Sequence, residues 1–202
     1  QAFAAALAGF DEHRVVDRAA SDPCAILYTS GTTGLPKGVV CAHGGYLATG
    51  RHTARILELA SRDRILVFLP LFHTNPQMYA LMGALHAGAS LAIRRRFSAG
   101  VFFDDARQSG ATGCTFVGTV LSILAARHAG ERKDHDMRFC IGGGTTAELA
   151  RTVHDRFGMF VHELYGMTEI GGWVSGSPRA EHRPGANGRI RDDIELRIFD
   201  ED

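Results

Sequence analysis

The sequence lacks the features that would mark a membrane, secreted or nucleic-acid-binding protein. No apolar run approaches the roughly 20 residues of a membrane-spanning helix, so no transmembrane segment is expected. Lysine plus arginine equals aspartate plus glutamate, at 22 each, so no net charge attracts nucleic acid. The four cysteines, Cys24, Cys41, Cys114 and Cys140, form no C-x-x-C pair. This pattern favours buried, reduced thiols in a cytoplasmic protein over disulfides or zinc.

What the chain does have is a repeated alternation of strand-like and helix-like stretches. Strands are expected at 25–29, 65–69, 90–93 and 160–162, and helices at 43–60, 76–86 and 147–157. The stretches 101–108, 115–117, 121–128 and 138–141 continue the alternation. Repeated βα units of this length predict an α/β fold, in which a parallel-rich sheet is layered with helices. Short β pieces are expected beyond Gly171, including a strand at 194–199.

We divide the chain into three regions on this basis. Residues 1–23 are expected to be a helix end and a polar connector, and 24–175 to be the α/β core. Residues 176–202 are expected to begin a β-rich subdomain. With 45% hydrophobic residues in 202, the chain can bury a substantial core.

The most informative segment is Tyr28-Thr-Ser-Gly-Thr-Thr-Gly-Leu-Pro-Lys-Gly38, which follows a predicted strand. Its glycines let backbone N–H groups converge, its hydroxyls add donors, and its lysine supplies a positive charge. Such a loop is suited to an anion with several oxygens. It is not a Walker A loop, because no Ser or Thr follows the lysine. The residues expected to contact the anion are Thr29, Ser30, Gly31, Thr32, Thr33, Gly34 and Lys37.

A second segment, Tyr165-Gly-Met-Thr-Glu169, lies more than a hundred residues further on. Together the two strings resemble the two signatures of the adenylate-forming enzymes, which include acyl-CoA ligases, luciferases and amino-acid adenylation domains. Further matches lie at Leu69-Pro-Leu-Phe-His73 and at Gly142-Gly-Gly144, with a weaker one at 184–188. The fold implied by the resemblance is part of the large N-terminal domain of such an enzyme.

The resemblance implies an acid–CoA ligase that uses ATP and Mg²⁺ and takes CoA as co-substrate. The enzyme would convert a small-molecule carboxylic acid to acyl-AMP, release pyrophosphate, and pass the acyl group to CoA. Lys37 and the loop would hold the pyrophosphate, Thr168 would bind the α-phosphate, Glu169 would bind Mg²⁺, and His73 would lie beside the acyl carboxylate. The nucleotide is expected to contact Gly142, Gly143, Gly144, Glu163, Leu164, Tyr165, Gly166, Met167 and Thr168.

Two of these segments also have other interpretations. Gly142-x-Gly144-x-x-Ala147 matches a dinucleotide fingerprint, with Glu163 where a ribose-binding acid would stand, so a Rossmann NAD(P)-dependent oxidoreductase is the alternative from another class. Thr145 and Glu148 form a possible capping box that needs no ligand. Thr168 could likewise cap a helix whose first turn carries Glu169.

The acid substrate is the least determined part of the prediction. Amino-acid adenylation domains place an aspartate shortly after the His73 region, whereas this chain has Thr74-Asn-Pro-Gln-Met78, so an amino acid is disfavoured. The stretch 68–97 looks most like the crotonobetaine/carnitine-CoA ligase group. Side chains expected to line the acyl pocket are Phe116, Gly118, Thr119, Met167, Gly172 and Trp173.

The chain also departs from the family pattern. The family's N-terminal subdomain, its ribose-binding aspartate and its C-terminal domain with a catalytic lysine have no counterpart in the sequence. The expectation is an internal fragment, inactive by itself, of a longer ligase whose N- and C-terminal parts are its partners. A stand-alone nucleotide-binding module is the competing hypothesis.

Overall fold

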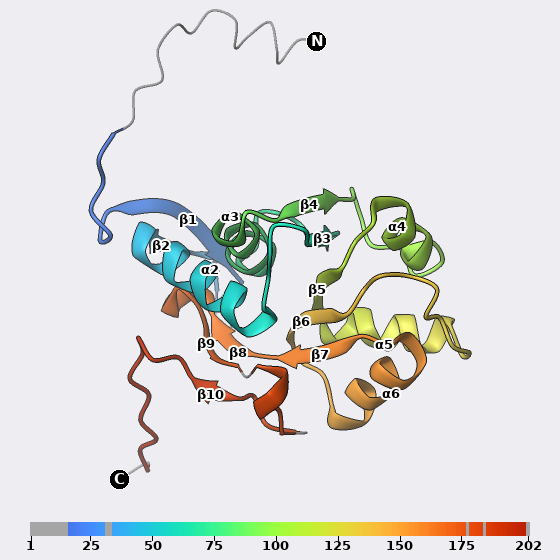
Figure 1. The fold of residues 1–202 in the computed structure, drawn as a ribbon. Coiled ribbons are helices and arrows are strands. Elements are labelled where there is room, and N and C mark those ends of the chain that lie inside the picture. Colours follow the sequence, from blue (N-terminus) through green and yellow to red (C-terminus); the bar gives the residue numbers. More distant parts are fainter. Residues whose placement is uncertain (1–15, 31–33, 177, 184, 201–202) are drawn as a thin grey trace, which may run out of the picture.

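The computed structural model describes residues 16–30, 34–176, 178–183 and 185–200. Its centre is a five-stranded parallel sheet, shown in Figure 1, in which every neighbouring pair runs in the same direction. The strand order is β4 (Ser90–Ile93), β3 (Arg64–Val67), β5 (Gly113–Val117), β6 (Phe139–Gly143) and β7 (Phe160–Glu163). The predicted α/β class with a parallel-rich sheet is confirmed.

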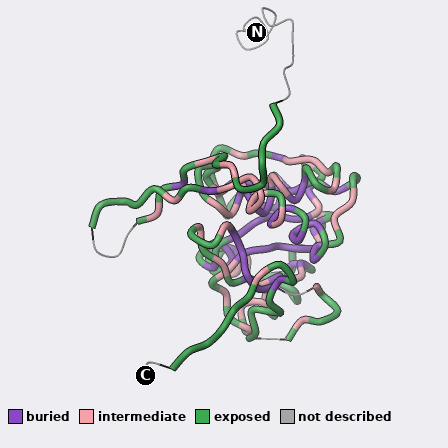
Figure 2. Tube along the Cα trace, turned by 90° about the vertical axis from the view of Figure 1, so that its left-hand side faces the viewer, coloured by how far each residue is buried: buried purple, intermediate pink, exposed green. Residues whose placement is uncertain are grey.

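Helices cover both faces of this sheet, because successive side chains of each strand point to opposite sides. On one face, Leu66, Cys140 and Val161 pack against α4 (Phe102–Ser109), α5 (Gly118–Arg127) and α6 (Ala147–Phe157). On the other face, Ile65, Val67 and Ile141 pack against α2 (His43–Leu57) and against η1 (Asn75–Leu81) with α3 (Met82–Ala87). Figure 2 shows the buried residues concentrated between these layers.

The signature loop joins two strands that do not belong to the parallel sheet. β1 (Pro23–Thr29) pairs antiparallel with β2 (Lys37–Ala42), a strand that the sequence reasoning missed. The apolar alternation in β2 is the signal that could have found it. Val39 and Cys41 face the core while Gly38 and Val40 face outward.

The C-terminal region forms a small antiparallel sheet beside the main one (Figure 1). It contains β8 (Tyr165–Met167), β9 (Gly172–Gly176) and β10 (Arg189–Ile190), with the 3-10 helices η2 (Thr168–Ile170) and η3 (Arg179–Glu181) in the connections. The predicted short β pieces beyond Gly171 are present, but the strand predicted at 194–199 is wrong. These residues have no regular structure, and Ile198 is 92% exposed, because no neighbouring strand offers them backbone partners.

Two further local predictions are corrected by the structure. The N-cap of α6 is Thr146, whose Oγ1 accepts the Leu149 N–H at 3.1 Å, and not Thr145. All four cysteines are free, but Cys24, predicted to be buried, is exposed on the outer face of the hairpin. None of the helices in the described ranges combines the length and the apolar character needed to cross a bilayer.

Candidate functional site

The two signature segments meet in space although they are 140 positions apart in the chain. Thr29 ends β1, and its Oγ1 donates to Glu169 Oε1 at 3.1 Å. Lys37 is the register partner of Thr29 on β2, so its backbone lies beside the same point. Ser30 and Gly34 stand on either side of Gly31, Thr32 and Thr33, which lie outside the described residues. The Thr29 hydroxyl, the Glu169 carboxylate and the backbone of Lys37 therefore lie in one small region of the molecule.

A hollow of about 310 Å³ lies next to this junction, where β5, β6 and β7 reach their carboxyl ends. Thr168 and Thr74 both line it, and their hydroxyl groups are hydrogen-bonded to each other at 2.7 Å. His73 stands at the rim, exposed, with its ring 4.5 Å from that of Phe72. The hollow is lined by His73, Thr74, Asn75, Tyr79, Val117, Gly142, Gly143, Leu164, Gly166, Met167 and Thr168.

Several residues expected to line the acyl pocket are not among those that line this hollow. Phe116 and Trp173 are fully buried in the two hydrophobic clusters, because each fills space between a strand and the helices on it. Gly118, Thr119 and Gly172 are also absent from the lining, and of the six residues expected there only Met167 contributes. Sequence reasoning missed Thr74 and Asn75, although both follow His73 directly.

Glu163 is engaged with the backbone of the glycine segment. Its Oε1 accepts the N–H of Gly144 at 2.7 Å and of Thr145 at 3.2 Å, which fastens the loop after β6 to the end of β7. Burial raises the pKa of this carboxyl, and the two N–H bonds oppose the rise. A Rossmann site needs this acid for a ribose, but here the loop itself occupies one oxygen, which counts against the oxidoreductase alternative. Glu163 therefore bonds the Thr145 N–H just before the helix, whose cap is Thr146.

The glycine segment separates the first hollow from a second one. Glu163 and Thr145 line a space of about 230 Å³ together with Phe160 and Arg179. Gly142 and Gly143 line the first hollow instead. The residues expected to contact the nucleotide are thus divided between two neighbouring spaces.

Thr168 lies inside the short 3-10 helix η2 rather than at its N-cap, which is Met167, and no side chain caps this helix. The capping interpretation of Thr168 is therefore wrong, since its hydroxyl is directed to Thr74. Glu169 is in the first turn and exposed. Tyr165 is 45% exposed, with its hydroxyl 3.8 Å from Met167 Sδ.

Comparison with known proteins identifies the family. The family model for AMP-binding enzymes matches residues 2–202. The chain is similar to the sulfoacetate–CoA ligase of Cupriavidus necator, with 34% identity over 83% of this chain and 33% of the relative. It is also similar to the oxalate–CoA ligase of Arabidopsis thaliana, with 32% identity over 89% of this chain and 38% of the relative.

Solved structures give the same result. The crystal structure of ATP-bound MatB from Rhodopseudomonas palustris superposes with a TM-score of 0.78 and 30% identity, covering 89% of this chain and 36% of that one. The chain thus spans little more than a third of the length of the proteins that it matches. It belongs to the AMP-binding enzyme family.

Proposed function

We propose that the complete protein is an ATP-dependent acid–CoA ligase. The observation that carries the proposal is the junction of the two signature segments at Thr29 and Glu169, beside a hollow large enough for a small acid. The first step would join the acid to AMP, and the second would transfer the acyl group to the thiol of CoA. The ATP-bound relative and the two CoA ligases named above support this assignment.

In the first step, a carboxylate oxygen of the acid attacks the α-phosphorus of ATP. The bond from this phosphorus to the bridging oxygen breaks, and pyrophosphate leaves with the electron pair. The protein contributes mainly position and charge to such a reaction. Lys37, Ser30 and the loop are assigned to the departing pyrophosphate, and Thr168, which lines the hollow, to the α-phosphate. His73 is assigned to the acid.

The donor set at the junction fits Mg²⁺, which prefers carboxylate, hydroxyl and phosphate oxygens. Glu169 would hold the ion, and the Thr29 hydroxyl lies 3.1 Å from the Glu169 carboxylate. A bound Mg²⁺ would supply positive charge to the phosphate oxygens. Because Glu169 is exposed, its carboxylate is free to reorient toward a bound ligand.

The hollow favours an organic acid over an amino acid. None of the described residues that line it carries a carboxylate to pair with a substrate amine. Tyr79, Met167 and Val117 give it apolar walls, and Thr74 with Asn75 provides polar groups. Acids of the crotonobetaine and carnitine type remain the finer proposal, supported only by the likeness of residues 68–97.

The test is acid-dependent exchange of pyrophosphate into ATP by the complete protein, followed by a coupled assay for acyl-CoA. The panel should include sulfoacetate, oxalate, carnitine, crotonobetaine, fatty acids and the twenty amino acids. Exchange and CoA-dependent turnover with an organic acid are expected. Exchange with amino acids alone would contradict the ligase assignment, and NAD(P)H turnover without exchange would favour an oxidoreductase.

A further inference from the structure

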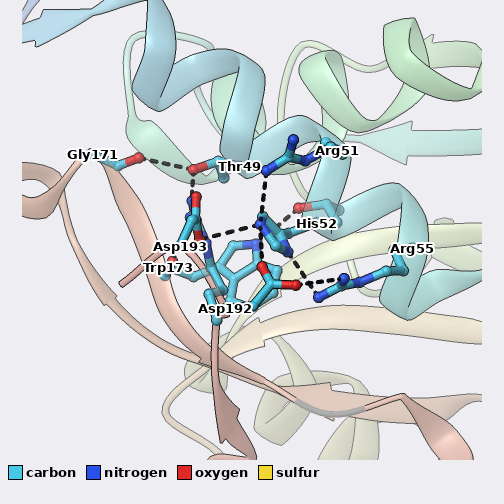
Figure 3. Close-up of polar contacts among 10 residues, drawn as sticks. Thr49, Arg51, His52, Arg55, Gly171, Trp173, Asp192 and Asp193 are labelled. Atoms are coloured by element: carbon cyan, nitrogen blue, oxygen red, sulfur yellow. Dashed lines mark hydrogen bonds and ion pairs between the residues drawn. The ribbon is translucent and has the colours of Figure 1, made fainter. Parts of the chain in front are cut away.

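The turn that carries Glu169 ends at Gly171, which is hydrogen-bonded to the polar network shown in Figure 3. The turn itself is closed by the Gly171 N–H, which donates to the Thr168 carbonyl at 3.0 Å. The Gly171 carbonyl accepts a hydrogen bond from Thr49 Oγ1 at 2.9 Å. Thr49 is fully buried in α2, so this bond ties the turn to a rigid helix.

The hydroxyl of Thr49 both donates and accepts a hydrogen bond. Its single proton goes to Gly171, and its oxygen accepts from Arg191 Nη1 at 3.0 Å. Contact between α2 and the turn is also close in space. A Cβ on Gly172 would lie 2.4 Å from Thr49 Oγ1, and the φ of +126° at Gly172 independently favours glycine. The turn and helix α2 are therefore fitted to each other at the level of single atoms.

Arg191 fixes Thr49 in turn, although it lies 142 positions away. Arg191 is 6% exposed, and its guanidinium also donates to the Trp173 carbonyl at 2.8 Å. Two more bonds, of 2.9 and 2.7 Å, run to the carboxylate of Asp193 in a bidentate pair. Such a fork holds the guanidinium in one orientation, which a lysine could not reproduce.

His52, two aspartates and their arginine partners close the network toward solvent. His52 Nδ1 lies 3.1 Å from Arg55, which assigns it as the acceptor, and Nε2 lies 3.2 and 3.3 Å from Asp193 and Asp192. The cluster of His52 with the two aspartates has the ligand types of a cation site. However, Arg55 and Arg191 already neutralise the carboxylates, and Arg51 lies 3.5 Å from His52. We therefore interpret the cluster as structural.

We propose that Thr49 and Arg191 are positioning residues for the Thr168–Gly171 turn and therefore for the carboxylate of Glu169. Thr29 contacts the turn through that carboxylate, and Thr49 contacts it through the Gly171 carbonyl. Loss of the Thr49 contact leaves a carbonyl without this partner and frees the turn to move. The consequence for catalysis rests on the proposed function, whereas the consequence for the turn does not.

The first experiment measures amide hydrogen exchange in the complete protein. Thr49→Val keeps the shape of the side chain and removes the hydroxyl, and we expect about tenfold faster exchange in peptides covering 168–171. Thr49→Ser should restore the slow rate. The matched control is Thr53→Val, one turn further along the same helix, because Thr53 is equally buried but accepts the Trp173 indole N–H at 2.9 Å instead.

The second experiment measures acid-dependent pyrophosphate exchange with the same variants. Thr49→Val should lower kcat about tenfold and leave the KM for the acid unchanged, because Thr49 does not line the hollow. Arg191→Lys should give the same split, and it serves as the second variant should Thr49→Val not fold. Thr53→Val should retain the wild-type kcat.

The outcomes separate this proposal from the proposed function. Equal hydrogen exchange at 168–171 in Thr49→Val and Thr53→Val would overturn the positioning role, whatever the activity. A failure of Thr49→Ser to restore the slow rate would do the same. Faster exchange only in Thr49→Val, in a protein without acid-dependent activity, would support the positioning role and contradict the ligase assignment.

Discussion

Replacing Glu169 by glutamine should separate catalysis from folding. Glutamine keeps the length of the side chain and the oxygen that accepts from Thr29, so the 3.1 Å contact can persist. A hydrogen bond to a charged acceptor contributes about 1 kcal/mol more than one to a neutral acceptor, and exposure reduces the difference further. The free energy of unfolding should therefore fall by less than about 1 kcal/mol, which corresponds to a decrease in Tm of less than about 4 °C.

The catalytic effect of Glu169→Gln should be much larger. If the carboxylate holds the magnesium ion that stabilises the transition state, its loss should cost about 2.7 kcal/mol or more, which is a hundredfold decrease in rate. The assays are pyrophosphate exchange over a magnesium titration and thermal unfolding of the same samples. Glu181→Gln is a matched control, because Glu181 is also exposed in a three-residue 3-10 helix. Wild-type activity of Glu169→Gln at limiting magnesium would refute the assignment.

Three further predictions follow from individual contacts. Lys37→Ala should slow the pyrophosphate-forming step while sparing thioester formation from supplied acyl-AMP, and equal losses in both half-reactions would indicate a structural role. Burial lowers the pKa of His52 from 6.5, and this effect is larger than the opposing effect of the Asp193 carboxylate. Protonation therefore favours the unfolded chain, and the free energy of unfolding should fall as pH drops below 6.5. His52→Gln should flatten this pH dependence in urea unfolding curves. Asp63 is 1% exposed and accepts hydrogen bonds from Arg138 at 2.8 Å and Thr112 at 2.9 Å. Asp63→Asn should therefore lower the free energy of unfolding by about 2 kcal/mol, measured by thermal unfolding. A change within experimental error would show these bonds to be unimportant. Burial raises the pKa of Asp63, but these bonds and that from the Ala60 N–H lower it overall, so its contribution should be lost as pH falls below 3.8.

The sheet and its helices could be predicted because their signals are local. Strands β3 and β4 and helices α2 and α6 lie within a few residues of the predicted ranges, since apolar spacing follows directly from the face that each element buries. Residues 194–199 alternate in the same way, yet they form no strand. Alternation states which side chains could share a face, whereas a strand also requires a neighbouring backbone to pair with.

The site was predictable in its parts but not in its support. Thr29, Thr168 and Glu169 stand in recognisable strings, each close after an expected strand, so a shared crevice could be inferred. The strands next to them pair antiparallel outside the parallel sheet, which the sequence pattern did not indicate. Thr49 and Arg191 belong to no motif, and their contact depends on how a helix and a late loop segment pack. No local pattern in the sequence encodes that contact.

The turn that carries Glu169 is contacted by two residues from one continuous segment, β1 through α2. β2 ends at Ala42 and α2 begins at His43, so the phosphate hairpin and the supporting helix are joined without a loop. Thr29 of the hairpin contacts the turn through Glu169, and Thr49 of the helix contacts it through the Gly171 carbonyl. A displacement of the hairpin on binding an anion would therefore pull on helix α2, which continues directly from β2. This arrangement couples the segment assigned to pyrophosphate with the carboxylate assigned to magnesium through two hydroxyl groups.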